Sequence, residues 1–196
     1  MTDVLWREAL ERFAAIHQRG LEAEEIEPTS VVLATASPQG RPSARVVLLK
    51  GFDAAGFVFY TNYESRKSEE LLANPFGALC FYWKTLGEQV RVEGRVEQVT
   101  PAESDAYWAS RARESQIGGW ASIQSRPVGH DGELEERFVR FASEFDGGDV
   151  PRPPHWGGFR LSPDRVEFWT VQAHRLHERV AYTLTDGAWQ VGRLFP

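Results

Sequence analysis

Residues that could carry chemistry gather near the C-terminus, where Arg175, His177 and Arg179 alternate with Leu176 and Glu178. Alternation of this kind predicts a β-strand, on which every second side chain points to the same face. Two guanidiniums flanking an imidazole would suit an anionic substrate that undergoes redox or acid–base chemistry. A solvated strand face of alternating charge shows the same pattern, and the spacing alone favours that interpretation.

Further cationic clusters occur in a chain whose formal net charge is −6. Arg66 and Lys67 open a predicted helix, where free N–H groups and the helix dipole favour an anion. Tyr107 and Arg111 are four residues apart on another predicted helix, with Ser115 just beyond, so the three could hold one phosphate. Exposed basic residues and an aromatic–cation contact on a helix surface are the alternatives. The acidic balance argues against a nucleic-acid partner and favours local anion sites.

Strand parity separates two other pairs of residues. Arg45 and Lys50 lie at opposite ends of one predicted strand, and a regular strand would point them to opposite faces. They could therefore serve two different phosphates. His174 and His177 would also point to opposite faces, and no third ligand lies near them, so no metal site is predicted.

The composition is that of a globular protein and predicts one domain spanning residues 1–196. Of the 196 residues, 42% are hydrophobic and 26% charged, and 7 Trp and 12 Phe residues supply material for a core. The single cysteine, Cys80, excludes an intrachain disulfide and is interpreted as a small buried apolar residue. No signal peptide and no membrane-spanning apolar run is found. A cytoplasmic location without a membrane partner is therefore expected.

Hydrophobic patterning predicts many short strands with a few helices between them. Strands are expected at 31–36, 44–50, 57–61, 76–83, 88–99, 159–161, 165–171, 176–184 and 188–194. Turns are expected at 37–40, at 51–56 and at Asp186-Gly187, a hairpin turn. In the strand at 88–99, apolar and charged residues alternate, which predicts one buried face. The pattern indicates a mainly β fold with α, an antiparallel barrel packed by helices.

Helices are expected at 3–19, 65–73, 100 to about 111, 118–123 and 132–145. Thr2 or Asp3 is expected to cap the first helix, and Gly20 to end it. Thr100 and Glu103 have the spacing of a capping box. The apolar stripe of the last helix is expected to consist of Leu134, Phe138, Val139, Phe141 and Ala142.

Two C-terminal stretches, Val166–Trp169 and Arg175–Arg179, resemble the signature of the pyridoxine/pyridoxamine 5′-phosphate oxidase family. Seven further stretches resemble family blocks in the same order: Arg45–Lys50, Phe59–Asn62, Ser65–Lys67, Glu88–Val90, Ser115–Gly118, Gln124–Ser125 and Trp156–Arg160. The resemblance runs from about Pro28 to Pro196. It implies the FMN-binding split-barrel fold and a homodimer with two FMN sites at the subunit interface. The strand meander at about 156–196 would complete the dimer and the active site.

The same resemblance implies roles for individual residues. FMN contacts would be Arg45, Val46, Val47, Leu48, Leu49, Lys50, Tyr60, Thr61, Arg66, Lys67, Gln89, Gln124, Ser125, Trp169 and Arg179, with Gln124-Ser125 expected to reach across the dimer. The substrate 5′-phosphate would contact Lys50, Tyr107, Arg111 and Ser115. Arg175, Leu176 and His177 would face the substrate, with Arg175 and His177 as the catalytic pair that orients it.

The implied reaction is FMN-dependent oxidation of pyridoxine or pyridoxamine 5′-phosphate to pyridoxal 5′-phosphate, with O2 as acceptor and release of H2O2, and of NH3 from the amine. Two features depart from the family pattern. The chain begins almost at its first helix, where family members often carry an arm that closes over the substrate, and Thr170 stands where Gln or a similar residue is expected. Two alternatives remain open: a sister FMN oxidase of the phenazine-biosynthesis type, and a non-catalytic protein that binds FMN or pyridoxal phosphate.

Overall fold

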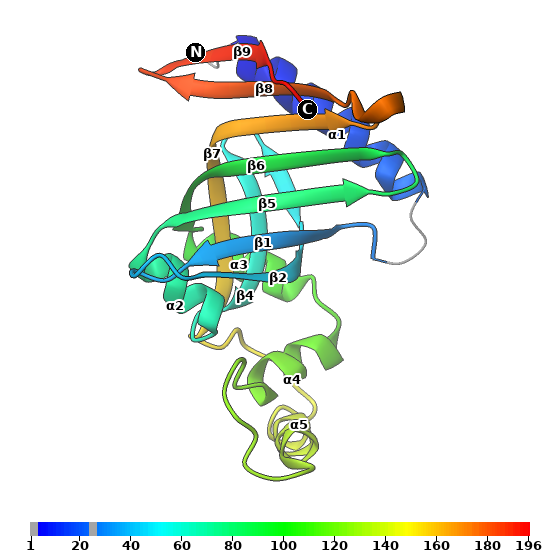
Figure 1. The fold of residues 1–196 in the computed structure, drawn as a ribbon. Helices are drawn as coiled ribbons and strands as arrows, with labels where there is room; N and C mark the ends of the chain where they lie inside the picture. The colour runs from blue at the N-terminus through cyan, green and yellow to red at the C-terminus, as the bar shows by residue number, and fades with distance from the viewer. Residues whose placement is uncertain (1–3, 24–26) are drawn as a thin grey trace.

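The computed structural model describes residues 4–23 and 27–196, and these residues form one sheet of nine strands. The strands pair antiparallel in the order β2-β1-β5-β6-β7-β4-β3, and β8 continues from β7 to β9. Figure 1 shows the sheet curling around a core, with α1 behind β8 and β9 and with α4 and α5 at the opposite end. The strands are β1 (Ser30–Ala36), β2 (Pro42–Leu48), β3 (Gly51–Asp53), β4 (Gly56–Asn62), β5 (Phe76–Trp83), β6 (Glu88–Gln98), β7 (Trp156–Thr170), β8 (Glu178–Thr185) and β9 (Ala188–Arg193).

The strands predicted up to residue 99 are confirmed to within two residues at each end. On β6, Val90, Val92 and Val96 are buried while Arg91, Glu93 and Arg95 reach the surface, so the predicted alternation is also confirmed. A register shift at Glu93/Gly94 interrupts the β6–β7 pairing. A Cβ at Gly94 would lie 2.1 Å from the Ser162 carbonyl oxygen, so only glycine allows this close approach.

The first helix is longer than predicted, because Gly20 lies inside α1 (Val4–Ala23) and does not end it. A Cβ at Gly20 would lie 2.1 Å from Nε1 of Trp83. The glycine therefore serves close packing of the Trp83 ring on the helix. The predicted caps, Thr2 and Asp3, lie outside the described residues.

The remaining helices are α2 (Arg66–Ala73), α3 (Pro101–Ala109), α4 (Arg113–Ala121) and α5 (Glu133–Glu144). The capping box that starts α3 is confirmed: Thr100 Oγ1 accepts from Glu103 N at 3.2 Å, and Glu103 Oε2 accepts from Thr100 N at 2.9 Å. The helix predicted at 118–123 begins and ends earlier. The stripe predicted on α5 is wrong at Leu134 and Val139, which are exposed, whereas Phe141 packs against a second, smaller core cluster.

The C-terminal meander differs most from prediction. The two strands predicted at 159–161 and 165–171 are one strand, β7, because residues between them stay paired with β6 around the register shift. The hairpin turn between β8 and β9 is confirmed, with φ of 52° at Asp186 and 79° at Gly187.

Arg175 and His177 do not lie on a strand, so the prediction that they share a strand face with Arg179 is wrong. Residues Ala173–Arg175 form a 3-10 turn, η1, and β8 begins only at Glu178. His174 and Arg175 adopt positive φ values of 56° and 62°, which a strand cannot contain. The backbone N–H of Gln172 donates to His177 Nδ1 at 3.1 Å and closes the turn.

No helix within the described ranges is long and apolar enough to cross a bilayer.

Candidate active site

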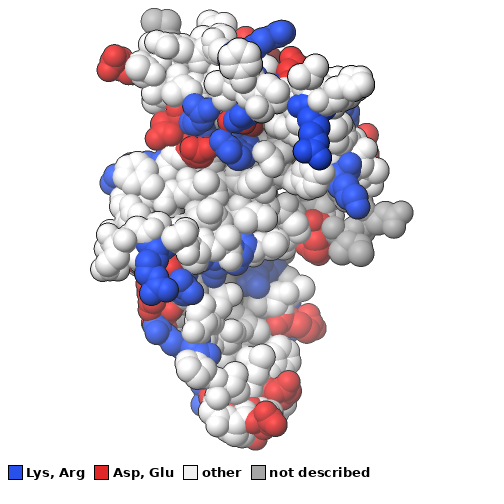
Figure 2. Space-filling model, viewed as in Figure 1, with Lys and Arg blue, Asp and Glu red and all other residues white. Residues whose placement is uncertain are grey.

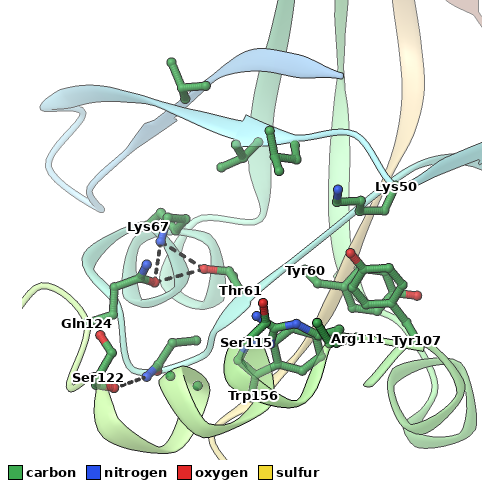
Figure 3. A pocket seen from close by; sticks show the side chains of 17 residues that line it. Lys50, Tyr60, Thr61, Lys67, Tyr107, Arg111, Ser115, Ser122, Gln124 and Trp156 are labelled. Atoms are coloured by element: carbon green, nitrogen blue, oxygen red, sulfur yellow. Dashed lines mark hydrogen bonds between the residues drawn. The ribbon is translucent and has the colours of Figure 1, made fainter. Parts of the chain in front are cut away.

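A cavity of about 690 Å3 opens between the end of β2, the strand β4 and the helices α3 and α4 (Figure 3). Eleven of its lining residues are predicted site residues: Val46, Val47, Leu48, Lys50, Tyr60, Thr61, Lys67, Tyr107, Arg111, Ser115 and Gln124. Residues implied for the cofactor and residues implied for the substrate phosphate thus line one cavity. In Figure 3, Lys67, Thr61 and Gln124 lie on one side, and Lys50, Tyr107 and Arg111 on the other.

Lys67 forms the first cationic end of the cavity. Its side chain extends from α2 and is buried, and its Nζ donates to Thr61 Oγ1, Ser65 Oγ and Gln124 Oε1, each at 2.9 Å. All three partners are neutral, and no ion pair within residues 4–23 and 27–196 includes Lys67. Burial, reinforced by the nearby positive charge of Arg45, lowers the pKa of Lys67 to about 8. A buried ammonium without a counter-ion is suited to binding a phosphate.

Gln124 reaches this end from the loop after α4. Its Oε1 also accepts from Thr61 Oγ1 at 3.1 Å, so Gln124 contacts the Lys67 cluster of its own chain. The expectation that Gln124 reaches across a dimer stays a prediction. The adjacent Ser125 is exposed, has a φ of 70° and does not line the cavity.

Arg111 forms the second cationic end. It lies just beyond α3, with its guanidinium carbon 4.6 Å from the ring centre of Trp156 and 5.1 Å from that of Trp108. Burial lowers the pKa of Arg111 from its ordinary value. Its buried Nη1 has no hydrogen-bond partner among the described residues. Two indole rings hold the guanidinium in place while one donor stays unpaired, an arrangement that suits an incoming anion.

Stacked aromatic rings lie next to Arg111 at this end of the cavity. The rings of Tyr60 and Tyr107 are nearly parallel with centroids 3.9 Å apart, and Trp156 lies 5.6 Å from Tyr60 and 6.1 Å from Tyr107. Burial raises the pKa of Tyr60, so its hydroxyl stays protonated at neutral pH. The stack fixes the orientation of Tyr107, whose hydroxyl belongs to the predicted phosphate site.

Lys50 and Ser115 complete the Arg111 end from two different elements. Lys50 lies beyond the end of β2 and is exposed, with its backbone N–H bonded to the Val58 carbonyl at 2.9 Å. Ser115 lies in the first turn of α4, and its exposed side chain lines the cavity. The parity argument for Lys50 does not apply, since the strand ends before this residue.

Three predicted cofactor residues on the N-terminal half lie outside the cavity lining. Arg45 points into a polar cluster around Glu70, Leu49 is buried in the core, and Arg66 pairs with Glu70 at 2.9 Å while its side chain stays largely exposed. Arg45 and Arg66 therefore meet at Glu70, and the positive charge of Arg45 is close enough to Lys67 to lower its pKa. Their predicted contact with FMN stays a prediction.

The predicted residues of the C-terminal half lie elsewhere on the chain. Gln89, Trp169 and Arg179 are directly opposite one another across β6, β7 and β8 and share one face of the sheet. The His177 ring lies 4.6 Å from that of Trp169. Leu176, His177 and Arg179 line a separate hollow of about 670 Å3, and Arg175 is exposed nearby. A single chain does not bring this group together with the Lys67–Arg111 cavity.

Several residues of the site are absent from the sequence-based assignment. Trp156 supports Arg111, Glu70 binds two predicted cofactor residues, and Glu167 is a buried carboxylate that accepts from Arg179. The spacing of Arg66 and Glu70, which is i and i+4 on a helix, was the one local signal that could have identified Glu70. Trp156 stands within a stretch that resembles a family block, but nothing local assigns its role.

The chain is similar to known proteins over almost its whole length. Residues 19–169 match the family model described as pyridoxamine 5′-phosphate oxidase, and residues 156–196 match the one described as pyridoxine 5′-phosphate oxidase C-terminal dimerisation region. A pyridoxine/pyridoxamine 5′-phosphate oxidase of Myxococcus xanthus (strain DK1622) is 57% identical over 187 residues, covering 95% of this chain and 91% of the relative. One from Synechocystis sp. (strain PCC 6803) is 51% identical, covering 94% and 87%.

Two solved structures share the fold. PhzG from Burkholderia lata 383, solved with tetrahydrophenazine-1-carboxylic acid, superposes with a TM-score of 0.89 at 29% identity and covers 100% of this chain and 94% of its own. An FMN-binding protein from Nostoc punctiforme PCC 73102 gives 0.76 at 21% identity, covers 100% of both chains and supports the fold alone. The predicted fold class, a split barrel of antiparallel strands with packed helices, is confirmed. The chain belongs to the pyridoxamine 5′-phosphate oxidase family and carries its C-terminal dimerisation region.

Proposed function

We infer that the protein oxidises pyridoxine 5′-phosphate and pyridoxamine 5′-phosphate to pyridoxal 5′-phosphate, with FMN as cofactor and O2 as acceptor. Hydrogen peroxide is released, and ammonia as well when the substrate is the amine. Two relatives named pyridoxine/pyridoxamine 5′-phosphate oxidase are 57% and 51% identical to this chain over almost its whole length. The observation that carries the inference is the cavity with two separate cationic ends, which suits one phosphate of a cofactor and one of a substrate.

The residues of the cavity fit FMN on chemical grounds. Lys67 is a buried cation with neutral partners only, so an added phosphate would supply the missing negative charge. Val46, Val47 and Leu48 give the adjoining wall an apolar surface suited to a flat ring system. We propose that Lys67, Thr61 and Gln124 hold the FMN phosphate. When bound, FMN supplies the two-electron redox chemistry, with O2 as the final acceptor.

The protein's own contribution is to hold the substrate in one orientation. Arg111 offers its unpaired Nη1 to the 5′-phosphate, and Lys50, Tyr107 and Ser115 surround the same space. Fixing the phosphate restricts the position of the pyridine ring. C4′ is then held in place before the reaction, so little entropy is lost in the transition state. Lys50 is exposed, so its ammonium can reach a phosphate in the cavity, whereas stacking on Tyr60 fixes the Tyr107 ring.

A complete active site requires two chains, because the C-terminal group does not line the cavity of its own chain. We propose a homodimer in which Trp169, Arg175 and His177 of one copy face the cavity of the other. Arg175 and His177 would then orient the ring and C4′ of the substrate. In the isolated chain Arg175 is exposed and Trp169 and His177 are half-buried, which leaves surface on each for contacts supplied by a second copy.

The sheet offers a surface for this dimer. The face of the sheet that contains Trp169 continues across β5, β1 and β2, where Tyr82, Val32 and Val46 are 59%, 40% and 61% exposed. Figure 2 shows mainly uncharged side chains over β1 and β5, next to a cluster of acidic and basic side chains over β6 to β8. Val46 also lines the cavity, so a partner on this face would reach the cavity mouth. Covering these apolar side chains would favour association.

The alternative substrate class is that of the phenazine-biosynthesis oxidases, and the superposition on PhzG supports the shared fold. Two observations favour the phosphorylated pyridine. The relatives named for that substrate are far more similar in sequence, and the Arg111 end of the cavity offers an unpaired cation for a phosphate.

The test is the absorbance spectrum of FMN-loaded protein before and after anaerobic addition of pyridoxine 5′-phosphate. We expect the flavin to bleach, and air to restore its colour with formation of pyridoxal 5′-phosphate. A flavin that binds but stays oxidised would reject the substrate assignment and leave the phenazine-type or binding alternatives. Absence of flavin uptake would reject the cofactor as well.

A further inference from the structure

Glu70 of α2 is a buried carboxylate, 7% exposed, at the contact between α2 and β1. Its Oε2 accepts hydrogen bonds from Ser43 Oγ at 2.5 Å and from Thr35 Oγ1, and lies 3.4 Å from Arg45 Nη2. Its Oε1 accepts from Arg66 Nε at 2.9 Å. One carboxylate thus connects two guanidiniums that come from different elements of the fold.

The pairing of β1 with β2 assembles this cluster. Thr35 lies opposite Ser43, and Leu33 lies opposite Arg45, so all four residues reach the same place. Arg45 Nη1 donates to Thr35 Oγ1 at 2.6 Å and to the Leu33 carbonyl at 3.1 Å, while Nη2 donates to Ser43 Oγ. Both terminal nitrogens of Arg45 are therefore engaged, and its guanidinium is held in one orientation.

The charges of the cluster match those of a phosphate. Arg45, Arg66 and Lys67 carry three positive charges and Glu70 one negative charge, which leaves a net charge of +2. Burial would raise the pKa of Glu70, but hydrogen bonds from Ser43, Thr35 and Arg66 outweigh it and lower the pKa to about 2. Glu70 is thus ionised at every pH at which the protein would work. A phosphate monoester carries close to two negative charges at neutral pH.

We propose that Glu70 is a positioning residue for the cofactor phosphate, which holds the guanidiniums of Arg45 and Arg66 beside Lys67. The proposal rests on the FMN site proposed above. Because only Nε of Arg66 contacts Glu70 and the side chain is 64% exposed, its terminal nitrogens stay available to an anion. Glu70 therefore does not touch the phosphate: it acts through the donors of Arg66 and through the fixed positive charge of Arg45.

The direction in which FMN affinity changes when Glu70 loses its charge separates this role from a purely electrostatic effect. Removing a negative charge near a bound phosphate would by itself strengthen FMN binding. Removing the residue that positions two guanidiniums would weaken it, because the phosphate loses preorganised donors. Glu70→Gln keeps the shape of the side chain and removes the charge, so it sets the two effects against each other.

The experiment titrates apo-protein with FMN and follows quenching of flavin fluorescence, with thermal unfolding of each apo variant as a check on folding. We expect Glu70→Gln to bind FMN roughly tenfold more weakly, since charge-assisted hydrogen bonds are lost. Glu64→Gln is the matched control, because it removes the same charge from an exposed residue just before α2. That variant should bind FMN as tightly as the unaltered protein, or slightly more tightly.

A double-mutant cycle tests whether Glu70 acts through its partner. If it does, Arg66→Gln weakens FMN binding, and Glu70→Gln adds little in that background. Should Glu70→Gln fail to fold, Ser43→Ala is the substitute, because it loosens the same cluster without changing any charge and is expected to weaken FMN binding a few-fold.

Unchanged or tighter FMN binding by folded Glu70→Gln would overturn the proposal, as would full additivity with Arg66→Gln. If Ser43→Ala carries the test, unchanged FMN affinity would overturn it. Failure of the unaltered protein to bind FMN would instead reject the proposed cofactor, so the two failures are distinguishable.

Discussion

The protonation state of Lys67 gives a quantitative prediction for cofactor binding. Its pKa of about 8 lies well below that of a free lysine, because burial disfavours the charged form and Arg45 lies nearby. Lys67 should be about nine-tenths protonated at pH 7 and about one-tenth protonated at pH 9. The phosphate of FMN stays a dianion over this range. FMN affinity should therefore fall by about tenfold between pH 7 and pH 9, if binding requires the ammonium.

The assay is a fluorescence titration of apo-protein with FMN at constant ionic strength. Lys67→Met should bind more weakly and show little pH dependence in this window, while Lys67→Arg should stay charged and bind with a nearly flat profile. A flat profile for the unaltered protein, or an equally steep one for Lys67→Met, would refute the assignment of Lys67 to the phosphate.

The stability of the apo-protein should rise with pH between about 8 and 10.5, whereas FMN affinity falls as pH increases. The folded-state pKa of Lys67 is about 8 and its ordinary value is 10.5, so the unfolded chain binds more protons between these values. Stability should therefore rise as pH increases through that window, and the rise should be smaller in Lys67→Met. Denaturant unfolding at several pH values measures it.

Three further predictions concern residues outside the Lys67 cluster. Arg111→Met should raise the KM for pyridoxine 5′-phosphate by about tenfold or more while FMN titrations stay unchanged, because it removes the unpaired donor of the second cationic end; weakened FMN binding would contradict this. Gly20→Ala should destabilise the protein by about 1–3 kcal/mol in denaturant unfolding, since the new Cβ would overlap the Trp83 ring, whereas the exposed Gln18→Ala should change stability by less than about 0.5 kcal/mol. Burial lowers the pKa of His17, so the unfolded chain binds more protons and stability should fall as pH drops below about 6.5. Thermal unfolding between pH 7 and pH 5 measures this fall, and it should be smaller in His17→Leu. An unchanged fall in that variant would exclude His17 as its cause.

Prediction from sequence succeeds here where the signal is local. The alternation on β6 requires only that one face is buried, and the capping box requires only Thr100 and Glu103 at their spacing. Gly20 shows the limit of such signals. Its place inside α1 depends on Trp83 of β5, which is far away in the sequence, so a rule for helix ends assigns it wrongly.

The segment from Val171 to His177 shows a second limit. An alternating pattern predicts a strand, but consecutive positive φ values at His174 and Arg175 form a turn that neither residue type signals. The burial and missing partners of Lys67 and Arg111 likewise come from tertiary packing. Composition identified both as cations, and the family resemblance assigned their roles, but neither could show that they are unneutralised ends of one cavity.

Central to this account is an active site shared between two chains, and subunit complementation tests it directly. Arg111→Met damages the cavity, and Arg175→Ala damages the C-terminal group, so each homodimer should have low activity. A heterodimer of the two variants, isolated with two affinity tags, would contain one intact site if the site is shared, and should regain about half of the unaltered activity. If each chain formed its own site, both sites would be defective and the heterodimer would stay as inactive as its parents.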